Sequence, residues 1–119
     1  MFELTQKKIE VCGVIITVQT ANALMGIKRA IMRDECLIDL RSEKFQDSPV
    51  ELVTLRWVYP DLISAVVDIQ GMQTPTFEQV AALPDELITA WSDAVYGLNP
   101  HWLPKSEEEI DKKKVTNSG

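Results

Sequence analysis

The sequence predicts a mainly helical fold. It indicates a compact helical domain whose N-terminus can form a short β-hairpin. Two observations predict the helices: apolar residues recur at steps of three and four in several segments, and capping residues stand where these segments begin. A third observation favours the hairpin, because β-branched residues cluster near the N-terminus. We expect a single helical domain over residues 1–104 and a flexible tail over residues 105–119.

The first segment, residues 7–20, holds the β-branched cluster, which Gly13 interrupts. β-branched side chains suit the pleated surface of a strand, and glycine allows a turn or a bulge. We therefore expect a short strand or a hairpin here.

The second segment predicts an amphipathic helix over residues 21–40, which Thr20 or Asn22 can cap. Apolar residues recur near the 3.6-residue period of a helix, and charged residues fall between them. The apolar set is Leu24, Ile27, Ile31 and Ile38, and the charged set is Lys28, Arg29, Arg33, Asp34 and Glu35. We expect the apolar set to face the core and the charged set to face water.

Residues 41–50 read as a loop of charged residues, Ser and Pro, and residues 51–70 predict a second and more buried helix. Its apolar positions alternate in steps of three and four: Leu52, Leu55, Tyr59, Leu62, Val66 and Ile69. Pro60 lacks an amide hydrogen, so we expect a kink or a break near Tyr59. Gly71 is a natural stop for this segment.

Two further helices follow. Thr76 and Gln79 have the spacing of a capping box, which predicts a short helix at about 76–82. Pro84 at a first helical position, followed by two acidic residues, opens another helix that runs to about Gly97. Its apolar stripe is Leu87, Ile88, Trp91, Val95 and Leu98.

Composition excludes several classes of partner. The formal net charge of −6 argues against nucleic-acid binding and against anionic membranes, because both require clustered Lys and Arg. No apolar run approaches the ~20 residues that span a bilayer, and the N-terminus lacks the pattern of a signal peptide. We expect a cytoplasmic protein in which Cys12 and Cys36 are reduced core residues.

No pattern of a catalytic, cofactor-binding or metal site is present, so we predict no enzyme and no cofactor. The sole histidine, His101, has no recognisable nucleophile beside it, and no phosphate-binding loop or metal-ligand spacing occurs. A small enzyme that relies on carboxylates is the least favoured alternative; its candidates would be Asp34, Glu35, Asp61 and Asp68.

Aromatic residues are the candidates for contact with other proteins, because they dominate the binding energy of many interfaces. Core packing is the alternative, and it is favoured for Trp91, which lies on an apolar stripe. Trp102 lies beyond the last predicted helix, where either interpretation holds. Tyr96 and Trp102 are therefore our candidate protein-interaction residues.

The stretch FEQVAALPDELITAWSDAVYGLNPHW, residues 77–102, resembles the tail assembly chaperones of long-tailed bacteriophages, the G-type proteins of lambda-like phages. The shared pattern is a short helix, an Ala-Leu-Pro link at residues 82–84, a helix that ends in Ala94 to Pro100, and an acidic tail. The first 75 residues match only in size and general layout.

The resemblance implies a protein that binds the tape measure protein and tail tube subunits in the host cytoplasm and is absent from the finished virion. It also implies self-association and no catalytic residues. Members of the family are often extended by ribosomal frameshifting, and Lys112, Lys113 and Lys114 would suit a slippery codon run. The alternative function is a small acidic regulatory or inhibitory module that occupies the basic site of a partner.

Overall fold

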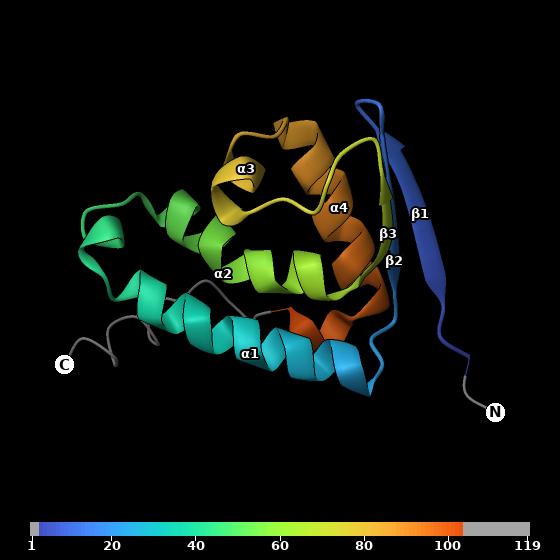
Figure 1. The fold of residues 1–119 in the computed structure, drawn as a ribbon, viewed down its shortest axis with the longest axis horizontal. Coiled ribbons are helices and arrows are strands. Elements are labelled where there is room, and N and C mark those ends of the chain that lie inside the picture. Colours follow the sequence, from blue (N-terminus) through green and yellow to red (C-terminus); the bar gives the residue numbers. More distant parts are fainter. Residues whose placement is uncertain (1–2, 104–119) are drawn as a thin grey trace.

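The computed structural model describes residues 3–103, which form a three-stranded antiparallel sheet and a layer of helices beside it (Figure 1). The fold is therefore mixed α/β, and the prediction of a mainly helical fold is corrected in this respect. The tail predicted over residues 105–119 lies outside the described residues. The predicted N-terminal hairpin and the main helices are confirmed.

Strands β1 (Gln6–Val11) and β2 (Val14–Gln19) form the hairpin, in which Ile9 pairs with Ile16. The two-residue turn between them places Cys12 at φ 54° and Gly13 at φ 77°. Two successive residues in the left-handed region match the twist of a tight antiparallel hairpin. Gly13 thus acts as the sequence predicted, and the strained position falls on Cys12.

The third strand, β3 (Val66–Gln70), pairs with the other edge of β2 and gives the sheet order β1-β2-β3. The prediction of helix over residues 51–70 is therefore wrong beyond residue 64. Val66 and Ile69 are three residues apart, which fits a helical stripe, but β-branched residues also suit a strand. Pairing with β2 satisfies the backbone of this segment and decides between the two.

Two long helices lie side by side in the lower half of Figure 1. Helix α1 (Ala23–Leu40) begins at Asn22, whose Oδ1 accepts a hydrogen bond of 2.9 Å from the Met25 amide. The 3-10 turn η1 (Glu43–Phe45) leads to α2 (Val50–Ser64). The connection predicted over residues 41–50 therefore contains one turn of helix.

Helix α2 runs through Pro60 without a break. Proline has no amide hydrogen, so the carbonyl four residues earlier, that of Arg56, loses its usual helical partner. The Sγ of Cys36 donates to this carbonyl at 3.4 Å. Of the predicted kink or break, the break does not occur, and a buried thiol on α1 compensates for the proline.

The last helices begin as the sequence predicts. Helix α3 (Phe77–Ala81) has both hydrogen bonds of the capping box between Thr76 and Gln79. Helix α4 (Asp85–Leu98) follows Pro84, and a 3-10 turn, η2 (Pro100–Trp102), follows α4. Three residues of the predicted stripe, Leu87, Trp91 and Val95, are buried in the core, and the other two, Ile88 and Leu98, are partly buried against it.

The main core lies between β2 and α4. Ile16 and Val18 on one face of β2 are fully buried, as are Trp91 and Val95 on α4. A second buried group fills the far end of the α1–α2 pair and consists of Cys36, Leu40, Phe45, Val53, Trp57 and Phe77. The outer side of α1 belongs to neither core.

Candidate protein-interaction surface

Helix α1 faces the opposite way from the sequence prediction. The stripe predicted to enter the core is exposed, with exposed fractions of 76% for Leu24, 57% for Ile27, 56% for Ile31 and 70% for Ile38. The prediction that the charged residues of this helix all face water is also wrong, because two arginines point inward. We call the four exposed residues the α1 outer face.

The inward arginines meet a fully buried carboxylate on α2. Oδ1 of Asp61 accepts a hydrogen bond of 2.5 Å from Nε of Arg29 and one of 3.0 Å from Nη2 of Arg33. Oδ2 of Asp61 accepts a hydrogen bond of 2.5 Å from the Tyr96 hydroxyl of α4. This buried cluster joins three helices around one negative charge.

Each arginine is also held by a tryptophan. Nη1 of Arg33 donates to the Trp57 carbonyl at 2.6 Å, and its guanidinium lies 3.9 Å from the centre of the Trp57 ring. Nη2 of Arg29 donates to the Trp102 carbonyl at 3.3 Å, and its guanidinium lies 4.8 Å from the Trp102 ring. Guanidinium groups stack well on aromatic faces, so both contacts fix the rotation of α1.

Burial is the largest cause of the pKa shifts in this cluster. Burial lowers the pKa of Arg33, and the negative charge of Asp61 opposes this effect. Burial raises the pKa of the Tyr96 hydroxyl far above its ordinary value, and the charge of Asp61 and the hydrogen bond to it raise it further. Tyr96 is therefore a neutral donor to a charged acceptor, which is a strong type of hydrogen bond.

Helix α1 turns two arginines inward because burying the Asp61 carboxylate without a positively charged partner would be costly. An unpaired carboxylate in the interior is far more costly than a buried pair with good hydrogen bonds. The signal for this was an aspartate in the middle of the apolar segment 51–70. A second signal was another apolar series along α1, on the side opposite the predicted stripe: Met25, Met32, Cys36 and Leu40.

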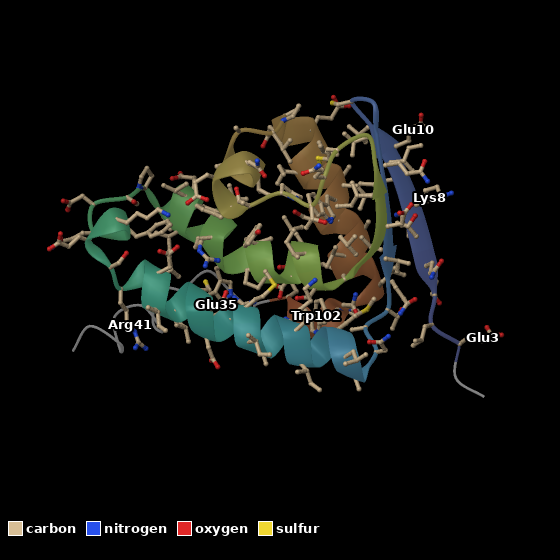
Figure 2. The ribbon with its side chains drawn as sticks, in the orientation of Figure 1. Glu3, Lys8, Glu10, Glu35, Arg41 and Trp102 are labelled. Carbon is tan, nitrogen blue, oxygen red and sulfur yellow. The ribbon has the colours of Figure 1, made fainter. Side chains whose placement is uncertain are left out.

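The two candidate contact residues lie inside. Trp102 is only 6% exposed and lies beside α1 (Figure 2), and Tyr96 is half-buried with its hydroxyl on Asp61. Of the two interpretations left open for Trp102, the structure thus favours core packing, and Tyr96 is not the exposed contact that the sequence suggested. Both residues support α1 from within, and the exposed aliphatic residues of α1 take their place as candidate contacts.

Asn99 fixes the start of α1, and no pattern in the sequence indicates this role. This residue is fully buried, and its Oδ1 accepts from the Ala21 amide at 2.8 Å. Its Nδ2 donates to the carbonyls of Gln19 and Val95, both at 3.1 Å. One side chain therefore ties the end of α4 to the link between β2 and α1.

The α1 outer face is flanked by charges. Lys28 and Glu35 are exposed and lie seven residues apart, hence on the same flank, and Asp34 lies on the other. Within residues 3–103 none of the three forms an ion pair. In Figure 1 the side of α1 turned away from α2 is not covered by another labelled element. The face is thus an apolar strip with polar edges.

A cleft of about 460 Å³ lies on the Lys28 flank. It separates α1 from β3 and the segment that follows it, and its lining mixes apolar and polar groups: Lys28, Ile63, Val66, Val67, Asp68, Ile69, Met72, Gln73 and Thr74.

Chemically, the described residues offer binding groups. No set of three or more His, Cys, Asp or Glu side chains within residues 3–103 is placed to hold a metal ion. Asp61 is enclosed by its partners, whereas Asp34 and Glu35 lie on the surface of α1. In the same part of the chain, no helix combines the length and the apolar character needed to cross a bilayer.

Comparison with known proteins gives no relative. No protein-family model, curated protein or solved structure matches this chain.

Proposed function

We propose that this protein is a tail assembly chaperone of long-tailed phages, which binds the tape measure protein through the α1 outer face. The observation that carries the proposal is the row of four aliphatic residues that are more than half exposed on one side of one helix. Contiguous apolar patches of this kind mark binding surfaces, because leaving them in water is unfavourable. The resemblance of residues 77–102 supplies the class of partner.

The chemistry of the face suits a helical client. Apolar residues at steps of three, four and seven form a strip that matches the apolar side of an amphipathic helix. Burying the exposed half of one such side chain contributes roughly 1 kcal/mol, so the strip favours reversible binding. Tail tube subunits and further copies of the chain are the other partners that the resemblance implies.

The test is coexpression with the tape measure protein encoded in the same genome. The wild-type chain should raise the soluble fraction of this client and copurify with it. Ile31→Asp places a charge in the middle of the α1 outer face and should abolish both effects. Val50→Asp is the matched control, because Val50 is 50% exposed at the start of α2, away from that face.

Salt separates this function from the acidic regulatory alternative. Contacts of the α1 outer face are apolar, so the complex should persist when the salt concentration rises. An acidic module that occupies a basic site would lose its partner steeply under the same change. Insolubility of the tape measure protein with both wild type and variants would contradict the chaperone proposal.

A further inference from the structure

The sequence of α1 is arranged nearly symmetrically about Ile31. Leu24 lies seven residues before Ile31 and Ile38 lies seven residues after it, and all three are exposed on the outer face. Lys28 and Glu35 stand on one flank, and their midpoint falls half a residue from Ile31. At a rise of about 1.5 Å per residue, this offset is below 1 Å.

Such an arrangement fits an antiparallel pair of helices related by a twofold axis. In that pair, a residue before the axis on one helix meets the residue equally far after the axis on the other helix. Each flank of one helix also meets the same flank of its partner. With the axis at Ile31, Leu24 of one helix meets Ile38 of the other. Lys28 of each copy then meets Glu35 of the other copy, which gives two ion pairs of opposite charge.

We infer that two copies of this chain pair antiparallel through their α1 outer faces, with Ile31 at the twofold axis and Lys28 of one copy beside Glu35 of the other. The occupant is a second copy because the face complements itself in both apolar character and charge. The pairing covers the face that the proposed client would use, so client binding and pairing of two copies exclude each other. The competition with the client rests on the proposed function, whereas the pairing of two copies does not.

The strength of the pairing follows from its size. One helix of this length presents a strip of about 20 Å, and an interface of that kind falls below the ~1,200 Å² of stable complexes. We therefore expect a dissociation constant on the order of 10 µM. A dimer of that strength forms in concentrated protein and yields to a client that offers a longer apolar surface.

Sedimentation velocity of the purified full chain over a range of concentrations tests the pairing without any client. The wild type should pass from monomer to dimer near 10 µM, as expected for a small interface. Ile31→Asp should remain monomeric, whereas Val50→Asp should behave as wild type. Circular dichroism of each variant verifies that the chain is still folded.

Charge reversal tests the orientation. Lys28→Glu and Glu35→Lys each create two like-charge contacts across the twofold axis, and each should weaken the dimer about tenfold. Mixing the two variants in equal amounts restores opposite charges at both contacts, so the mixture should dimerise as the wild type does. The double variant Lys28→Glu/Glu35→Lys should also recover.

Three results would overturn the pairing: a wild type that stays monomeric at high concentration, a dimer that Ile31→Asp leaves intact, and a mixture of charge variants that fails to recover. A chain that remains monomeric but keeps the tape measure protein soluble would refute the pairing alone. A dimer with no effect on that protein would instead refute the chaperone function.

Discussion

Ile31 and Arg33 lie two residues apart on α1 and point to opposite sides of it. Ile31 is 56% exposed, whereas the side chain of Arg33 is only 13% exposed and bonds to Asp61. A helix normally places the aliphatic residue inside and the arginine in water. The reversal shows that the buried carboxylate of α2 sets the rotation of α1, and that it thereby leaves an apolar strip on the surface.

Replacing the carboxylate of Asp61 should therefore destabilise the whole fold. Asp61→Asn leaves two guanidinium groups without their counter-charge, and loss of one member of a buried ion pair typically costs about 3–5 kcal/mol. Denaturation in urea measures the free energy of unfolding. Asp39→Asn is the control, because Asp39 is 28% exposed and, within residues 3–103, forms a single ion pair, with Arg56 at 2.8 Å. Equal losses in the two variants would contradict this account.

The stability should fall at alkaline pH because of Tyr96. Its pKa in the folded chain lies above the ordinary value of 10.0, so the folded state keeps the proton that the unfolded state releases. The stabilisation is complete below pH 10 and is lost as the pH rises further, at about 1.4 kcal/mol per pH unit. Tyr96→Phe should remove this part of the slope; an unchanged pH profile in the variant would refute the role of the hydroxyl.

Removing the amide of Asn99 should loosen the start of α1. Asn99→Ala leaves the Ala21 amide and the Gln19 carbonyl without their partner, at a cost of about 2–3 kcal/mol in the free energy of unfolding. The rate of hydrogen exchange should then increase more at the Ala21 amide than at the amides of β2. Unchanged protection of this amide would show that the side chain does not fix the link.

Two glycines provide a matched test of the sheet. Gly71 has φ 96°, and a Cβ there would lie 2.6 Å from the Gly13 carbonyl oxygen, whereas a Cβ at Gly13 would have nothing within 4 Å. Gly13→Ala should cost about 1 kcal/mol through its positive φ alone, and Gly71→Ala should cost more because backbone must shift. Thermal melting compares the two, and a larger loss at Gly13 would contradict the structure.

The sequence predicts local structure here better than it predicts orientation. The capping box at Thr76 and the turn at Gly13 depend on neighbouring residues, and both are confirmed. Strand β3 was missed because Val66 and Ile69 fit a helical spacing, and only the open edge of β2 makes them a strand. Whether a segment forms a strand or a helix, and which side of it faces the core, depends on residues distant in the chain. The spacing of apolar residues within one segment carries no information about them.

The same limit explains the candidate contacts. The sequence leaves Trp102 open between core packing and contact and makes Tyr96 a candidate contact, because neither residue has its partner nearby in the chain. Their partners are Arg29 and Asp61, which lie 73 and 35 residues away along the chain. The exposed face was missed because α1 carries apolar residues on both of its sides, and the spacing of the Leu and Ile series predicted that this series faces the core.

The most direct test of the α1 outer face is methyl NMR of the chain with labelled isoleucines, recorded while a soluble segment of the tape measure protein is added. We predict that the methyl signals of Ile27, Ile31 and Ile38 shift or broaden, while that of Ile16, which is fully buried, remains unchanged. Unchanged signals on α1, together with changes confined to the sheet or to no isoleucine at all, would contradict this prediction.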